Sequence, residues 1–353
     1  MADDNRYLVE LYDVKKWFPI QQGIIDSIFS KGKELNVRAV DGVSIKIEKG
    51  EVFGLAGESG SGKTTVGRLA LGLLKVTSGK VVFDGVDLST LSKEELRKKR
   101  RRMQVIFQDP MASLNPRMTI GEAVAHPLII HYPERKKDKR AIVEEVLERV
   151  GLAPASLFVD KYPHQISGGQ RQRIVVARAL ITRPELILAD EPIAMADVSV
   201  RALLLDLMNQ LKDEFNLTYL FITHDLATAK YICDRIAIMY LGKMVEIGPL
   251  VKIYTYAQHP YTRALLAAVP VPDPNYRRQE PLPRGEIPSP INPPPGCRFH
   301  PRCPIARDIC KEEEPEMLPV AEEPEHLVAC HLRTGAYQHL DPGKIKATAR
   351  TSE

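Results

Sequence analysis

A glycine-rich run ends in one lysine and two threonines: residues 57–65 read GESGSGKTT. Apolar residues 52–56 precede this run and a helical pattern follows from Val66, so the segment predicts a strand, a tight turn and the start of a helix. Backbone N–H groups at such a helix start converge on an anion. The pattern therefore predicts a site for a nucleoside triphosphate. Its candidate binding residues are Gly57, Ser59, Gly60, Ser61, Gly62, Lys63, Thr64 and Thr65.

Each residue type in this run suits a part of the ligand. Glycines let the backbone approach a polyphosphate and adopt φ values that a side chain disfavours. We expect the Lys63 ammonium to reach the β- and γ-phosphates, and the Thr64 hydroxyl to join the coordination shell of Mg²⁺.

A second candidate element ends in two carboxylates: residues 186–192 read LILADEP. Four apolar residues before the acidic pair predict a buried parallel strand whose C-terminal end faces a ligand crevice. At that position Asp190 is expected to hold the Mg²⁺ shell through water. Glu191 is then left to polarise the attacking water as a general base.

The remaining chain must position these two elements. With 353 residues, the length predicts two domains or one domain with appendages. Short Val- and Ile-rich runs predict core strands, and the stretch 112–180 is mainly helical in pattern. The expected strands are residues 8–11, 43–47, 80–83, 186–189, 219–223 and 235–240. Nine prolines between Pro281 and Pro304 predict a separate, extended appendage.

Charge and hydropathy narrow the function classes. The 49 basic residues nearly balance the 45 acidic residues, which argues against nucleic acid as the main partner. No apolar run of eighteen or more residues and no signal-peptide profile are present in the sequence. We therefore expect a soluble, cytoplasmic chain.

The segment around Ser167 makes the interpretation specific. Residues 166–170 read ISGGQ and precede a helical pattern, so they predict a second helix N-terminus that could face an anion. The segment resembles the signature motif of the ATP-binding-cassette (ABC) superfamily, usually LSGGQ, with Ile166 in place of leucine. The resemblance implies that this motif caps the γ-phosphate bound by a different subunit. The residues concerned are Ser167, Gly168, Gly169 and Gln170.

Further motifs follow in the order that the ABC family shows. Gln108 matches the Q-loop, which the resemblance implicates in sensing Mg²⁺ and in joining the core to the helical subdomain. His224 matches the switch histidine that contacts the γ-phosphate, and Asp197 matches the D-loop aspartate. The D-loop lacks the usual serine, because Ala194 stands there. Phe18 is the candidate aromatic residue that stacks on adenine, with Trp17 as the alternative.

Four segments resemble the ATPase subunits of oligopeptide and dipeptide importers. They are residues 108–118 (QDPMASLNPRM), 162–164 (YPH), 259–262 (HPYT) and 285–290 (GEIPSP). Related cassettes also serve nickel and oligosaccharide uptake, and the resemblance runs over roughly residues 7–331. It implies a subunit that binds and hydrolyses ATP to power import of one of these solutes.

Four of the five cysteines lie in the C-terminal part, at Cys297, Cys303, Cys310 and Cys330. Cytosolic thiols stay reduced, so clustered cysteines suggest metal before disulfides. Four thiolates suit a [4Fe–4S] cluster or a tetrahedral zinc ion, and packed thiols without a ligand are the third alternative. The resemblance implies an iron–sulfur cluster in at least some members of the subfamily.

Together these observations predict an α/β fold: a RecA-like P-loop NTPase core with an antiparallel β-subdomain, a helical subdomain and a C-terminal Cys-containing extension. The expected division is a nucleotide-binding domain at residues 1–258, with its helical subdomain at about 112–180, an extension at 259–340 and a tail at 341–353. ATP and Mg²⁺ are the expected cofactors, with a [4Fe–4S] cluster in the extension.

The resemblance also implies partners: a second ABC ATPase subunit, identical or paralogous, two transmembrane permease subunits and an extracytoplasmic solute-binding protein. The expected location is the cytoplasmic face of the membrane, without nucleic acid. The competing class is a soluble ABC protein of translation or DNA repair. Such proteins usually fuse two cassettes or insert long coiled coils, and this chain shows neither feature.

Overall fold

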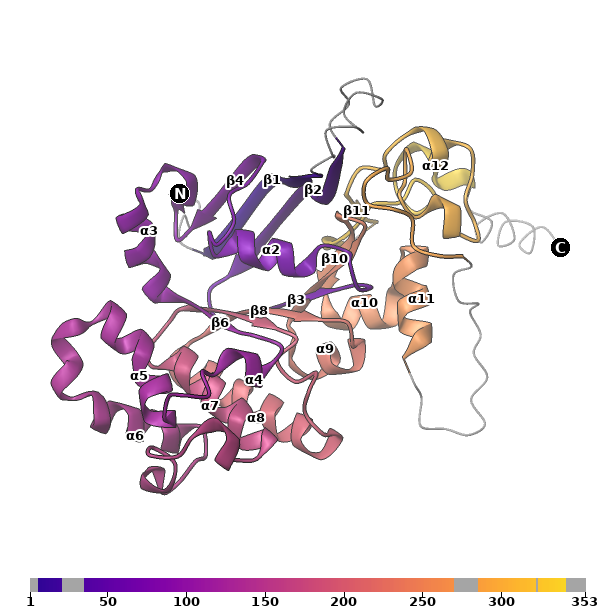
Figure 1. Cartoon of the computed structure of the whole chain (residues 1–353). Helices are drawn as coiled ribbons and strands as arrows, with labels where there is room; N and C mark the ends of the chain where they lie inside the picture. Colours follow the sequence, from indigo (N-terminus) through magenta and orange to yellow (C-terminus); the bar gives the residue numbers. More distant parts are fainter. Residues whose placement is uncertain (1–5, 21–34, 270–284, 322, 341–353) are drawn as a thin grey trace, which may run out of the picture.

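A mixed sheet of eight strands forms the centre of the computed structural model, which describes residues 6–20, 35–269, 285–321 and 323–340. Five neighbouring strands from β9 to β6 run parallel, and the strands on the far side of β9 pair antiparallel (Figure 1). In their order across the sheet the strands are β11 (Leu318–Val320), β12 (Glu323–Val328), β10 (Lys243–Pro249), β9 (Arg235–Tyr240), β3 (Val52–Ala56), β8 (Thr218–Thr223), β7 (Leu186–Asp190) and β6 (Met103–Ile106).

Alternating side chains of the parallel strands pack into two separate hydrophobic cores, one on each face of the sheet. In β8, Tyr219 and Phe221 face the core that includes the helical subdomain, whereas Leu220 and Ile222 face the other core. Both faces are covered, which explains why these strands are uninterrupted apolar runs in the sequence.

A second sheet of four antiparallel strands lies above α2 (Lys63–Ala70) in Figure 1. Its strands contain the predicted runs 8–11, 43–47 and 80–83 but extend further, because β1 and β2 form one long hairpin. In order across the sheet they are β2 (Asn36–Glu48), β1 (Tyr7–Pro19), β4 (Ser78–Phe83) and β5 (Val86–Asp87). This sheet is the predicted antiparallel β-subdomain.

The helical subdomain lies on the face of the large sheet opposite α2 (Figure 1). Within it, α5 packs against both α6 and α7. Its helices are α4 (Pro110–Ser113), α5 (Ile120–His131), α6 (Lys139–Arg149) and α7 (Gly168–Leu180). The remaining helices of the described cassette are α3 (Lys93–Lys99), α8 (Val198–Phe215), α9 (Leu226–Ile232) and α10 (Leu250–Tyr256). No helix in the described ranges is long and apolar enough to cross a membrane.

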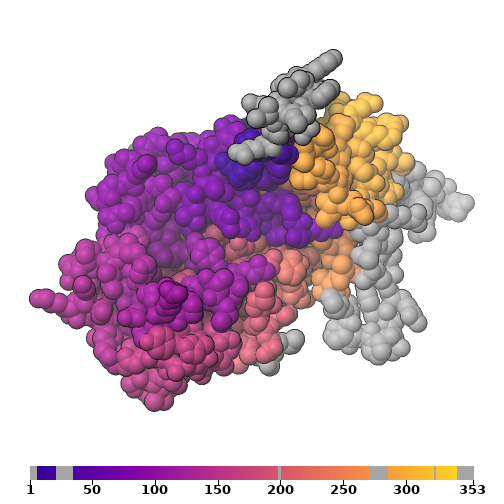
Figure 2. All heavy atoms as spheres, in the orientation of Figure 1, coloured from indigo at the N-terminus to yellow at the C-terminus, as the bar shows by residue number. Residues whose placement is uncertain are grey.

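The C-terminal part departs from the expected separate appendage. Strands β11 and β12 extend the large sheet beyond β10, and Phe299 is buried in the main core. The helices of this C-terminal part are α11 (Pro260–Ala268) and α12 (Ile309–Glu312). Figure 2 shows its orange and yellow atoms lying directly against the indigo N-terminal strands. The proline count misled the prediction, because a segment with few apolar residues can still dock onto a core built by others.

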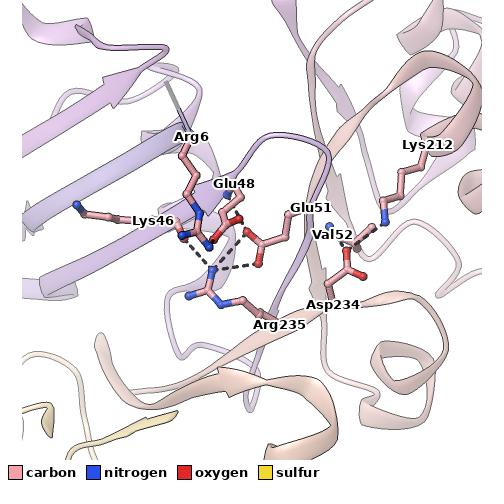
Figure 3. A network of polar contacts seen from close by, with 8 residues as sticks. All are labelled: Arg6, Lys46, Glu48, Glu51, Val52, Lys212, Asp234 and Arg235. Atoms are coloured by element: carbon pink, nitrogen blue, oxygen red, sulfur yellow. Dashed lines mark hydrogen bonds and ion pairs between the residues drawn. The ribbon is translucent and has the colours of Figure 1, made fainter. Parts of the chain in front are cut away.

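Buried charges join the two sheets at the end of β3 away from its glycine turn (Figure 3). Glu51 is only 7% exposed, and Arg235 of β9 donates to its two carboxylate oxygens at 3.0 and 3.3 Å. The same guanidinium donates to the backbone oxygen of Lys46 in β2 at 3.2 Å. Burial raises the pKa of Glu51, while Arg235 lowers it. Through its bond to Lys46, Arg235 links the β-subdomain to the core sheet.

Candidate active site

The glycine turn between β3 and α2 leaves no room for side chains at two positions. Gly57 and Gly62 have φ angles of +150° and +108°. A Cβ atom at Gly57 would lie 2.2 Å from the Met239 carbonyl oxygen, and one at Gly62 would lie 2.1 Å from that of Ala39. Glycine is required at both positions because the loop is packed between β9 and β2.

Lys63 is buried at the first position of α2, beneath the turn. Its ammonium donates to the carbonyl oxygens of Gly57 at 2.8 Å and Glu58 at 3.0 Å. Burial lowers its pKa, and nearby Glu191 and Asp190 oppose that shift. The ammonium is thus held inside the loop where a polyphosphate would add negative charge.

Ser61 points to a ligand in the same loop. Its side chain is 4% exposed, and its Oγ has no hydrogen-bond partner among the described residues. A buried hydroxyl without a partner is costly unless a bound group satisfies it. Ser59 and Gly60 are exposed at the tip of the loop, and Thr65 follows in the first turn of α2.

Thr64 and Asp190, which the sequence predicts to hold Mg²⁺, lie in contact. The Thr64 hydroxyl donates to the Asp190 carboxylate at 3.2 Å, which brings α2 to the end of β7. Burial raises the pKa of Asp190, and the bond from Thr64 opposes that shift. A hydroxyl and a carboxylate are oxygen donors of the kind that Mg²⁺ prefers, so these residues fit the ion.

Glu191 is the centre of a three-residue cluster. Gln108 donates to its Oε2 at 2.9 Å, and His224 Nδ1 lies 3.0 Å from its Oε1. The Glu191 backbone has a φ angle of +49°, which is uncommon outside glycine and is typical of functional sites. The three side chains come from the ends of β6, β7 and β8, so the parallel sheet collects the predicted catalytic residues at one edge.

The signature segment is organised by its own bonds. Ser167 caps α7: its Oγ accepts from the Gln170 backbone N–H at 3.3 Å, while Gln170 Oε1 accepts from the Ser167 backbone N–H at 3.0 Å. Ser167 and Gly168 are exposed, and Gly169 is half-buried. Because α7 and α2 lie on opposite faces of the sheet, the fold does not join this segment to the phosphate loop of the same chain.

Two further predicted residues lie near the periphery. Asp197 is exposed at the start of α8, where its backbone oxygen accepts from Val200 and Arg201. Phe18 is half-buried in β1 opposite Val37.

Trp17 differs from Phe18 in having a fixed polar partner. Its indole N–H donates to Asp41 at 3.0 Å, and the Arg38 guanidinium lies over its ring. A cation also lies over the Phe18 ring, where the Lys16 ammonium is 5.0 Å from the ring centre, so both adenine-stacking candidates carry such a contact.

Two residues of the C-terminal part reach the phosphate loop, and sequence reasoning missed their role. The buried Tyr261 hydroxyl accepts from the Glu58 backbone N–H at 2.8 Å. Arg302 donates to both carboxylate oxygens of Glu58, at 2.8 and 3.1 Å. The HPYT segment was the available signal for Tyr261, whereas no local pattern marks Arg302.

The four C-terminal cysteines gather in one module but do not form a metal-binding group. The Cys297 backbone N–H donates to the Cys310 oxygen at 2.9 Å, and all four are free thiols. Burial raises the pKa of Cys297 and Cys330 to about 12. Throughout the described ranges, no three His, Cys, Asp or Glu side chains are placed to hold a metal ion. This arrangement does not support the predicted [4Fe–4S] cluster.

Comparisons with known proteins agree with this geometry. Residues 40–194 match the ABC transporter family, and residues 245–310 match the C-terminal region of oligopeptide/dipeptide transporters. The chain is 49% identical to the oligopeptide transport ATP-binding protein AppF of Bacillus subtilis, covering 94% of this chain and 99% of that protein. It is also 49% identical to a putative peptide import ATP-binding protein of Brucella ovis, covering 84% and 93%.

A solved structure of similar fold is the dimeric ATP-binding cassette MJ0796 in a post-hydrolysis state bound to ADP and Pi. The TM-score is 0.59 at 31% identity, over 69% of this chain and 98% of that one. The resemblance therefore covers the cassette and, through the relatives above, the C-terminal region as well. The chain belongs to the ABC transporter family and is one of its ATP-binding, ATP-hydrolysing subunits.

Proposed function

We propose that this chain powers the import of oligopeptides or dipeptides. The observation that carries the proposal is the match of residues 245–310 to the C-terminal region of oligopeptide/dipeptide transporters. Oligosaccharide and nickel remain the alternative solutes, because other subunits of such a transporter select the solute.

The proposed hydrolytic step uses the cluster at the sheet edge. Lys63 would hold the β- and γ-phosphates, and Thr64 and Asp190 would hold Mg²⁺, which would supply positive charge beside the phosphates. Glu191 accepts a proton from the attacking water. Gln108 contacts one carboxylate oxygen of Glu191 and His224 contacts the other, and together they orient this carboxylate.

The second half of the proposed site comes from a partner subunit. Ser167, Gly168, Gly169 and Gln170 stand at the exposed start of α7 and would cap the γ-phosphate held by the other cassette. The dimeric state of the similar cassette MJ0796 supports a pairing of two cassettes, and we propose that they meet head to tail. Asp197 is proposed to lie at the same subunit contact and Phe18 to stack on adenine.

The assembly proposed around the dimer has two transmembrane permease subunits and a solute-binding protein. The chain would be bound peripherally at the cytoplasmic face of the membrane. The partner cassette is either a second copy of this chain or a paralogue.

A [4Fe–4S] cluster in the extension remains a proposal that rests on four cysteines within one module. Its formation requires the four thiols to move together and to release their protons. Iron and acid-labile sulfide measured in anaerobically purified protein test it. Absence of both with a folded extension refutes the cluster and leaves zinc or packed thiols.

Reconstitution with the transporter's other subunits in liposomes tests the transport function. We expect labelled di- or oligopeptides to accumulate with ATP and the solute-binding protein, and stimulated ATP hydrolysis to accompany uptake. Vesicles in which every cassette carries Glu191→Gln are the negative control. Uptake of nickel or oligosaccharide but not of peptide would contradict the proposed solute while leaving the ATPase role intact.

A further inference from the structure

Two segments of the C-terminal part converge on one residue of the phosphate loop, Glu58. Tyr261 of α11 accepts from its backbone N–H, and Arg302 binds its carboxylate through two hydrogen bonds. These segments lie on either side of residues 270–284 in the sequence. The main chain and the side chain of Glu58 are thus held independently.

Arg302 is held in place by aromatic rings. Only 8% of its side chain is exposed, and its guanidinium lies 5.8 Å from the ring centre of Tyr240 and 6.0 Å from that of Phe299. Phe299 is 1% exposed and packs edge-on against Tyr240. A planar guanidinium fixed by packing loses little freedom when it binds a carboxylate at two points, so this pair is a strong one.

A second ion pair anchors the same module beside the loop. Arg298, which is buried, bonds to Asp41 of β2 and to the Leu241 carbonyl oxygen. Asp41 also accepts from Trp17. The module thus has contacts with the cassette that do not involve Arg302, so a change at Arg302 can be separated from loss of the whole module.

The ion pair between Glu58 and Arg302 affects the electrostatic potential at the phosphate loop. Glu58 lies inside the glycine turn, and its charge is close enough to Lys63 to oppose, together with Glu191 and Asp190, the lowering of that ammonium's pKa by burial. An unpaired carboxylate there would repel a triphosphate that carries several negative charges, and in a half-buried loop that repulsion is only weakly screened.

We propose that Arg302 is a positioning residue for ATP binding: it neutralises and fixes Glu58, so that the C-terminal module completes the phosphate loop of its own chain. This inference rests on the nucleotide-binding role proposed for residues 57–65. It assigns the extension an effect on ATP affinity, while the cluster around Glu191 retains the chemical step.

The test compares Arg302→Gln, Arg302→Lys, and Arg302→Gln combined with Glu58→Gln in the assembled complex. Arg307→Gln is the matched control, because Arg307 is exposed in the same module. We expect Arg302→Gln to raise the ATP dissociation constant and KM about tenfold, with kcat changed less than about threefold. Arg302→Lys should restore most of the affinity. The double variant should return to within about threefold of wild type, because the repelling charge has gone.

Two results would overturn the inference. One is ATP affinity unchanged in Arg302→Gln; the other is a loss of affinity that Glu58→Gln does not relieve, which would indicate a packing role only. Thermal unfolding of each variant checks that the module is folded, and the double variant remains informative if Arg302→Gln is unstable. Lys63→Ala separates the two proposals: if it leaves ATP binding intact, the phosphate-loop assignment itself fails.

Discussion

The two parts of the molecule that we propose to contact ATP differ in how far one chain prepares them. In the phosphate loop, Lys63 is buried with two carbonyl partners, and Thr64 is bonded to Asp190. The signature segment instead is exposed at Ser167 and Gly168, and the bonds of its capping box are local. The first half is organised before any partner arrives, whereas the second half offers a helix start to another molecule.

This contrast determines which free energies depend on assembly. A preformed polar pocket reduces the reorganisation required when a ligand binds. An exposed helix N-terminus in water gains little until a partner excludes solvent around the anion. Nucleotide affinity should therefore be a property of the single chain, and hydrolysis a property of the dimer.

The largest expected effect is on the catalytic base. Glu191→Gln keeps the size and one oxygen of the side chain but removes the proton acceptor, so hydrolysis should fall by about 10²–10⁴ while ATP binding persists. A stable ATP-bound dimer should accumulate, measurable by size-exclusion chromatography.

Glu134→Gln is the control for this substitution, because Glu134 is exposed in the helical subdomain. Near-normal turnover of a complex in which every cassette carries Glu191→Gln would show that another group accepts the proton.

One variant in each half tests whether the two halves act separately. Lys63→Ala removes the buried ammonium and should weaken ATP binding to the isolated chain by about 10–100-fold. Ser167→Arg should leave that affinity within about twofold, yet should reduce hydrolysis by the complex more than about tenfold. Equal losses of ATP affinity in both isolated variants, measured by calorimetry, would refute the division between the halves.

A smaller effect should appear in the pH dependence of stability, beneath the phosphate loop. His259 caps α11 through Nδ1 and is 1% exposed; burial lowers its pKa to about 4, while Glu246 raises it and Arg333 lowers it. The unfolded chain binds this proton near pH 6.5, so the stability is complete above pH 6.5 and falls as the pH drops, until the loss levels off near pH 4. Between pH 7 and 5 the loss should be about 2 kcal/mol.

His259→Asn retains a capping side chain without the titrating ring, so it should flatten this part of the profile. Denaturant unfolding of both proteins at pH 5, 6 and 7 gives the measurement. An unchanged slope would assign the acid sensitivity to other groups.

The sequence predicts the phosphate-loop half well because its signals are local. A strand, a glycine turn and a helix start within a few residues define residues 57–65, and two carboxylates after an apolar strand define Asp190 and Glu191. Parallel strand order then brings Gln108 and His224 to the same edge. The structure brings these side chains within hydrogen-bonding distance, while their roles stay predictions.

Long-range contacts were beyond such reasoning. Nothing near Glu58 marks Arg302 as its partner, and nothing near Glu51 marks Arg235, because these pairs depend on how separate elements dock. The proline-rich composition likewise hid the strands β11 and β12, which gain their backbone partners from β10 and from each other. The clustered cysteines suggested a metal site, but whether thiols can share a metal depends on where the fold places their side chains.

The separation of Glu58 and Arg302 in the sequence also affects when the phosphate loop is completed during synthesis. Their positions differ by 244 residues, and at about 5–20 residues per second a ribosome needs roughly 12–50 s to translate that interval. During that time the growing chain already contains its glycine turn but lacks the arginine that neutralises it. If Arg302 acts as proposed, full affinity for ATP is acquired only after the C-terminal module has been made and docked, so an unfinished subunit is a poor competitor for the cell's nucleotide.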